Sequence, residues 1–220
     1  MARKIVFGSY DTAATGGWTL CEWSISDPVY EQHFIDVPGR RRGPLDASAI
    51  LTDGEPVYGS RTLTARLETS EGTRLERESV INTMVNWLNG WRMNIFLPDD
   101  DAHYITGRVQ VSRQYSDPAH ASVVVTAICE PWRYANDETE VTLTATEEEQ
   151  TATLTNSGRL SVVPLIVVTG GTVNLTFGTS SWSLSAGTYA LPDLRLQQGT
   201  ASLTYSGTGT VKLTYREAVL

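Results

Sequence analysis

The stretch TRLERESVINTMVNWLNG, Thr73 to Gly90, carries the helical pattern from which the rest of the fold can be worked out. Thr73 and Glu76 have the spacing of a capping box, in which the hydroxyl and the carboxylate each accept a backbone N–H. Apolar residues recur every three or four positions, as on one face of a helix: Ile81, Met84, Val85 and Leu88. Gly90 can end the helix in a left-handed conformation. We expect a helix over residues 74–89 and no other long one.

Segments on both sides of this helix alternate between apolar and polar residues, which is typical of β-strands with one buried face. The expected strands lie within 56–68 before the helix and within 91–97, 105–111 and 121–129 after it. The sequence therefore predicts that residues 1–134 form a β-domain with one helix.

Residues 135–220 repeat short alternating strands and turns without a helical period. Residues 160–168 are almost continuously apolar, which favours a strand covered on both faces, with Pro164 at a bulge or an edge. Gly170-Gly171 is typical of a hairpin turn. Roughly eight strands at close spacing favour an antiparallel β-sandwich, joined to residues 1–134 by a polar linker near 134–139.

The composition excludes several classes of protein. The formal net charge is −8 and the pI is about 4.9, which disfavours a general nucleic-acid binder because that function needs a basic surface. No apolar run approaches the roughly 18 residues of a membrane span. The apolar stretch near the N-terminus is too short for the hydrophobic region of a signal peptide. Cys21 and Cys129 are expected to be free, partly buried thiols.

Motifs for catalysis, cofactors or metals are absent from the sequence. The histidines at 33, 103 and 120 lack partners at zinc-ligand spacing, and no nucleophile elbow or phosphate-binding loop occurs. The acidic runs 99–101 and 147–149 are interpreted as solvated loops, since the first lacks the spaced ligands of a calcium loop. We therefore expect no enzyme, no cofactor and no metal.

Two groups of residues are candidates for binding. Arg40, Arg41 and Arg42 form either a solvated hairpin tip or a contact with an acidic partner, and in an acidic chain that partner is best sought in a second copy. Trp182 and Tyr189 either pack in the core of the sandwich or form an aromatic platform for a sugar. The second alternative would make the chain a carbohydrate-binding module.

The order of short motifs resembles the distal tail protein (Dit) family of phages with long non-contractile tails. The resemblance covers nearly the whole chain, and its elements are 38–40, 43–46, 56–61, 81–90, 104–109, 129–132, 156–158, Pro164, 189–194 and 213–217. Arg41-Arg42 stands where the family often has an Asp after Pro-Gly-Arg.

The resemblance implies an N-terminal domain that forms a sixfold ring and a C-terminal galectin-like β-sandwich. It also implies a structural, non-enzymatic hub of the tail tip, or baseplate, that joins the tail tube to the host-adsorption apparatus. The expected partners are other copies of the chain in a homohexamer, the tail tube protein, a tail-associated hub protein and receptor-binding proteins. The expected location is the virion tail tip, after assembly in the bacterial cytoplasm.

Overall fold

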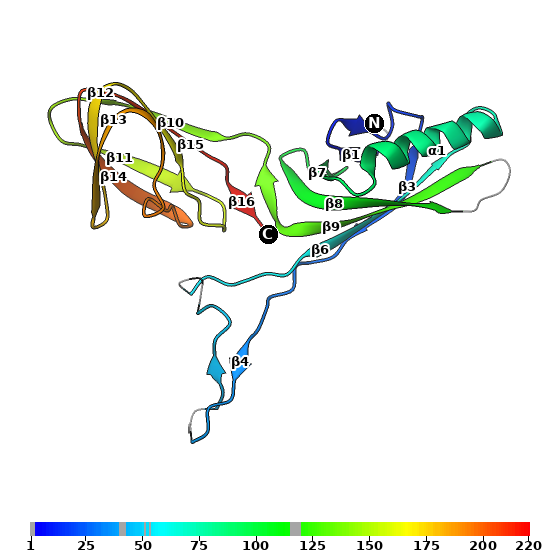
Figure 1. Cartoon of the computed structure of the whole chain (residues 1–220), viewed down its shortest axis with the longest axis horizontal. Coiled ribbons are helices and arrows are strands. Elements are labelled where there is room, and N and C mark those ends of the chain that lie inside the picture. Colours follow the sequence, from blue (N-terminus) through cyan, green and yellow to red (C-terminus); the bar gives the residue numbers. More distant parts are fainter. Residues whose placement is uncertain (1–2, 40–42, 51, 53, 115–119) are drawn as a thin grey trace. The chain divides into compact units, whose positions relative to one another are not determined.

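The computed structural model describes residues 3–39, 43–50, 52, 54–114 and 120–220, and the chain divides into two compact units (Figure 1). The first unit comprises residues 1–133 and the second 134–220. Each unit has its own cluster of buried apolar residues. The chain is mainly β with one helix in the described residues, as the sequence predicted.

Helix α1, Arg74–Leu88, begins and ends at the expected signals. The Thr73 backbone N–H donates to Glu76 Oε2 at 2.6 Å, and the Glu76 N–H donates to Thr73 Oγ1 at 3.4 Å. Gly90 has φ +84° just beyond the helix, in the left-handed region. Ile81, Met84 and Leu88 are the buried positions of the helix, which confirms the predicted stripe. No helix in the described part of the chain has the length and apolarity needed to span a membrane.

The first unit contains a strongly curved antiparallel sheet, close to half a barrel. The strands follow one another in the spatial order β2-β1-β7-β8-β9-β6-β3. Their bounds are β1 Val6–Phe7, β2 Tyr10–Asp11, β3 Thr19–Ile25, β6 Arg61–Thr69, β7 Arg92–Phe96, β8 His103–Gln114 and β9 Ala121–Ala135.

Helix α1 covers one face of this sheet. Leu63, Ala65 and Leu67 of β6 are fully buried in the same cluster as Met84 and Leu88 of the helix. The residues between them on β6 point to the opposite face, where the intervening positions are exposed or half-buried. The sheet therefore has one apolar face under the helix and one polar face that no other described element of the unit covers.

A long excursion leaves the sheet between β3 and β6, and we call residues 26–60 the arm (Figure 1). It contains a short hairpin of β4, Phe34–Ile35, and β5, Leu45–Asp46. At its base, Tyr30 and Tyr58 form an isolated bridge, and the Tyr58 ring packs edge-on against Trp132 with 5.6 Å between centroids. No residue of the arm belongs to the described core cluster of the first unit.

The second unit is one nearly closed, barrel-like antiparallel sheet. Its six strands have the order β10-β15-β12-β14-β11, with β13 paired to β12. The bounds are β10 Thr139–Ala145, β11 Gln150–Asn156, β12 Leu165–Phe177, β13 Ser180–Ala190, β14 Gly199–Gly207 and β15 Gly209–Tyr215. The short strand β16, Ala218–Val219, is not part of this sheet. Fully buried Leu154, Ile166, Leu175, Leu194 and Leu203 fill the interior.

Two details of this unit differ from the sequence-based expectation. Gly170-Gly171 does not form a hairpin turn but a bulge inside β12, where the pairing with β13 shifts between Val168 and Thr172. At this bulge β12 changes its second neighbour, from β15 for residues 165–169 to β14 for residues 173–176. The apolar run is not covered on both faces either: Val163 and Leu165 are exposed, while Ile166 and Val168 are buried. Pro164 immediately precedes β12.

Candidate assembly surfaces

The arginine run at 40–42 lies outside the described residues, so its role as a subunit contact stays a prediction. The glycines on its two sides, Gly39 and Gly43, have φ of +83° and +79°. Both values lie in the left-handed region that favours glycine. The backbone therefore adopts a left-handed conformation at the glycine before the run and again at the glycine after it.

Trp182 and Tyr189 both lie on β13 and are half-buried against the core cluster of the second unit. The Tyr189 hydroxyl donates to the backbone oxygen of Ser185 at 2.9 Å. Each ring thus already packs against protein on one side. The structure does not bring the two side chains together with further polar groups in a described cavity.

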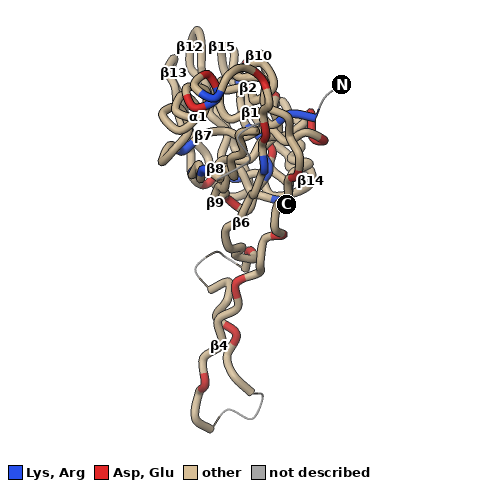
Figure 2. Tube along the Cα trace, turned by 90° about the vertical axis from the view of Figure 1, so that its right-hand side faces the viewer, with Lys and Arg blue, Asp and Glu red and all other residues tan. Residues whose placement is uncertain are grey.

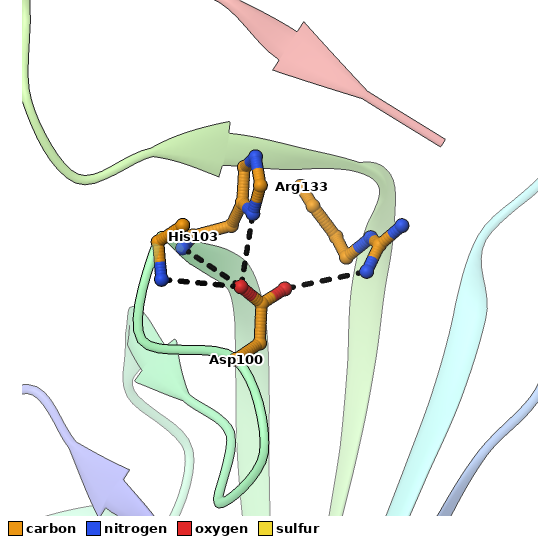
Figure 3. A network of polar contacts seen from close by, with 4 residues as sticks. Asp100, His103 and Arg133 are labelled. Carbon is orange, nitrogen blue, oxygen red and sulfur yellow. Dashed lines mark hydrogen bonds and ion pairs between the residues drawn. The ribbon is translucent and has the colours of Figure 1, made fainter.

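The sequence analysis predicted that residues 99–101 form a solvated loop. Asp100 departs from this prediction, because its side chain is mostly buried. Its Oδ1 accepts hydrogen bonds from the backbone N–H groups of Ala102 and His103, and lies 2.9 Å from His103 Nδ1. Its Oδ2 lies 3.2 Å from Arg133 Nη1 (Figure 3), and only 16% of the Asp100 side chain is exposed. Burial alone raises the pKa of this carboxyl, but His103 and Arg133 lower it more, so its pKa lies below the usual value.

The cysteines also differ from the expectation that both are partly buried. Cys21 is exposed on β3, whereas Cys129 is buried in the first unit's core, and both are free. Burial raises the pKa of Cys129 to about 11, which keeps this thiol protonated and inert near neutral pH. Among the described residues, no group of three or more His, Cys, Asp or Glu is arranged to hold a metal ion.

A surface that the sequence analysis did not single out surrounds the turn between α1 and β7. We define this turn surface by Trp87, Gly90, Trp91, Arg108 and Ile128. Trp87, Trp91 and Ile128 are 57%, 64% and 67% exposed, although residues of this size and apolarity are usually covered. A groove of about 520 Å³ lies on the side of the two tryptophans and another of about 560 Å³ on the side of Ile128.

The charge at the turn surface is positive. Arg92 forms an ion pair with Glu130. Arg108 lies directly opposite Arg92 on the neighbouring strand and donates to the backbone oxygen of Gly90 at 2.6 Å. Arg108 has no carboxylate partner among the described residues. Arg108 lines the groove on the side of Ile128, on the sheet face opposite the helix, whereas the two tryptophans line the other groove.

The arm is the second exposed apolar region of the first unit. Its exposed apolar residues are Val29, Tyr30, Phe34, Ile35, Val37, Leu45 and Ile50. The charged residues in its described part are all acidic, which Figure 2 shows as red segments without blue. Asp36 and Asp46 have no ion-pair partner within the part of the chain that the structure describes. An isolated two-stranded hairpin is marginally stable at best in water, and here the hairpin is continuous at both ends with strands of the first unit's sheet.

These features define a class of protein: a mainly β protein with a curved sheet that carries one helix, a separate barrel-like unit, and exposed apolar residues concentrated on the first unit. No family model and no curated protein sequence matches the chain. A comparison with solved structures does find a match, the crystal structure of the Dit (gp 19.1) protein of phage SPP1, described as a paradigm of the hub adsorption apparatus in phages that infect Gram-positive bacteria.

The match extends over both units. The TM-score is 0.67, and the alignment covers 97% of this chain and 98% of SPP1 Dit at 15% sequence identity. The chain therefore has the fold of the phage distal tail protein, as its sequence motifs indicated. At this level of identity the similarity shows the fold alone.

Proposed function

We propose that the chain is a structural, non-enzymatic component of a phage tail tip, a homohexameric ring that joins the tail tube to the host-adsorption apparatus. The observation that carries this proposal is the correspondence with SPP1 Dit over 97% of the chain, including both units. A shared enzyme scaffold can carry many functions, but here the match spans the complete two-unit arrangement of elements instead of one common domain.

The polar face of the first unit's sheet supports this role. Thr62 and Arg66 of β6 and Arg108 and Gln110 of β8 are exposed on the face opposite the helix. A sheet with one apolar and one polar face suits the wall of a water-filled ring, with the polar face toward the lumen and the helix on the outside. Ring closure needs head-to-tail contacts between copies, because each copy must offer two different surfaces.

The tail tube protein, a tail-associated hub protein and receptor-binding proteins are the proposed partners, and the virion tail tip is the proposed location. No observation favours the carbohydrate-binding alternative, because the rings of Trp182 and Tyr189 pack against their own core. The same proposal assigns Arg40, Arg41 and Arg42 to contacts with an acidic neighbour. Replacing all three by Ser should weaken assembly at low salt more than at high salt, because screening already weakens such pairs at high salt.

Two measurements test the hub role. Electron microscopy of the purified chain, or of the chain mixed with its tail tube protein, should show rings with a central channel. Antibodies against the chain should label the distal end of the tail in intact virions. Labelling of the capsid or of the whole tail length, or an absence of the protein from virions, would contradict the proposal.

A further inference from the structure

Asn89-Gly90 is the only Asn-Gly pair in the sequence, and it forms the turn between α1 and β7. Asparagine loses ammonia most readily before glycine, because no side chain shields the glycine nitrogen. In this reaction the Gly90 backbone nitrogen attacks Cγ of Asn89. The N–Cγ bond forms, the Cγ–Nδ2 bond breaks, and ammonia leaves with the proton that the Gly90 nitrogen gives up. Water then opens the cyclic imide at either carbonyl carbon and leaves aspartate or isoaspartate.

The structure holds both reacting groups apart. The Gly90 N–H donates to the backbone oxygen of Val109 at 2.7 Å, and ψ of Asn89 is 121°, which directs the Gly90 nitrogen toward β8 and away from the Asn89 side chain. The side-chain Oδ1 of Asn89 accepts the N–H of Val111 at 3.1 Å. Ring closure therefore needs the turn to leave β8.

The turn is held mainly by polar contacts at the surface. Arg108 Nη1 donates to the Gly90 oxygen at 2.6 Å, and the Val109 N–H donates to the Trp91 oxygen at 2.9 Å. Asn89 and Gly90 are both exposed, so water and hydroxide reach them once these hydrogen bonds open. Segments held by exposed hydrogen bonds open locally without unfolding of the whole domain.

We propose that Asn89-Gly90 is a site of spontaneous deamidation whose rate is set by the opening of the α1–β7 turn from β8. Asn89 caps the helix through its backbone N–H, which donates to Val85 at 3.0 Å, and binds Val111 through its side chain. Isoaspartate cannot keep both contacts, because its main chain runs through the former side-chain carbon. The product therefore marks chains in which the turn has opened, and it alters the turn surface permanently. The reaction is independent of the hub role.

Incubation of the full chain at pH 8, in buffer and in concentrated urea, tests the proposal. Peptide mapping by mass spectrometry locates the deamidated residue, and an isoaspartate assay identifies the product. In urea, Asn89 should react faster than every other asparagine. In buffer it should react at least about tenfold more slowly, because an opening free energy of about 1.4 kcal/mol already lowers the open fraction tenfold.

Arg108→Ala removes one contact that holds the turn without changing either reacting group. The rate at Asn89 in buffer should rise by about two- to tenfold, as for the loss of one surface hydrogen bond, and the rate in urea should not change. Arg66→Ala is the matched control, because Arg66 is exposed on the same sheet face but pairs with Glu68, away from the turn. Continued protection of the buried Cys129 thiol shows that the unit stays folded in each variant.

Four outcomes would overturn the proposal: a faster reaction at another asparagine in urea, equal rates at Asn89 in buffer and in urea, a wild-type rate in folded Arg108→Ala, or an equal acceleration by Arg66→Ala. The comparison of buffer with urea uses wild type alone, so it decides the matter even if Arg108→Ala loses stability. None of these results bears on virion labelling, which tests the hub role.

Discussion

Asp100 connects a β-turn to the last residues of β9 through one carboxylate. Its folded-state pKa lies below the unfolded value of about 3.9, so the unfolded state binds more protons at acidic pH. The stability that the carboxylate contributes is therefore complete above about pH 4 and is lost as the pH falls through the folded-state pKa. We expect Asp100→Asn to lower the free energy of unfolding at pH 7 by roughly 1.5–3 kcal/mol, as for hydrogen bonds to a charged group.

Urea unfolding at pH 7 and at pH 3 measures this effect. The difference between wild type and Asp100→Asn should shrink at pH 3, because the carboxyl of the unfolded chain, with its ordinary pKa of about 3.9, is then protonated. Asp99→Asn is the control, because Asp99 forms an ion pair with Arg3 in which both side chains are half or more exposed, and such pairs contribute little. A difference that is equal at both pH values would mean that the charge of Asp100 does not stabilise the fold.

The two cysteines differ in exposure, which predicts their reactivity. Cys129 is buried with a pKa of about 11, whereas Cys21 is exposed and its pKa is raised by partial burial and by neighbouring Glu68. We expect a thiol reagent at pH 8 to modify one cysteine per folded chain and two per chain in denaturant. The reaction of the folded chain should be slow at pH 8 and should become faster as the pH rises. Cys21→Ser should abolish the reaction of the folded chain. Rapid modification of both thiols in wild type would show that the core around Cys129 opens.

At the scale of elements, the bend in β12 depends on glycine for two separate reasons. Gly170 and Gly171 have φ of +68° and +73°, so alanine at either position meets the left-handed penalty of about 1–2 kcal/mol. At Gly171 a Cβ would in addition lie 1.6 Å from the backbone oxygen of Thr208 in the β14–β15 turn, whereas at Gly170 it would meet nothing within 4 Å. A clash this close with backbone atoms forces β12 away from the β14–β15 turn.

The matched pair of alanine variants separates these two contributions. Gly170→Ala should lose about 1–2 kcal/mol, and Gly171→Ala should lose roughly 3–5 kcal/mol or fail to fold, as expected for a clash that the backbone cannot relieve. Chemical unfolding of the two full-length variants provides the comparison. Equal stability would show that the second unit adapts its β12 bulge without strain.

The helix and the bulge show why sequence predicts some elements and not others. Capping by Thr73 and Glu76 is local, within four residues, so the helix bounds follow from the sequence to within one residue. Gly170-Gly171 carries the same local signal for a hairpin and for a bulge. The choice depends on the turn at Gly207–Gly209, almost forty residues later, where the Thr208 N–H donates to the backbone oxygen of Thr172 at 2.9 Å. That contact has no local signal.

The candidate site was harder to predict than the fold for a related reason. The sequence predicts that Trp87 and Trp91 lie outside the buried stripe of α1 and are therefore exposed. It does not reveal whether a partner covers such an exposed position. The arm has the same ambiguity, because adjacent apolar residues such as Phe34 and Ile35 do not reveal in the sequence whether another surface covers them. Only the packing of the other elements shows that nothing in the described chain covers these residues.

At the scale of the whole molecule, exposed apolar surface is distributed unevenly between the two units. Of the 13 large apolar residues that are exposed in the described chain, 11 lie in residues 1–133 and only Val163 and Leu165 lie in residues 134–220. Large exposed apolar regions are typical of protein contacts. We therefore expect self-association to reside in the first unit, and the second unit to project from the assembly without holding it together.

Fragments of 1–133 and 134–220 test this division, since each unit has its own core. The 1–133 fragment should associate at tens of micromolar, in the same order of size as the full chain, because it retains both the arm and the turn surface. The 134–220 fragment should stay monomeric, because its nearly closed sheet leaves little apolar surface exposed. Circular dichroism first establishes that each fragment is folded, and light scattering then gives its mass. A folded, monomeric 1–133 beside an associating 134–220 would move the assembly contacts to the second unit and contradict this assignment.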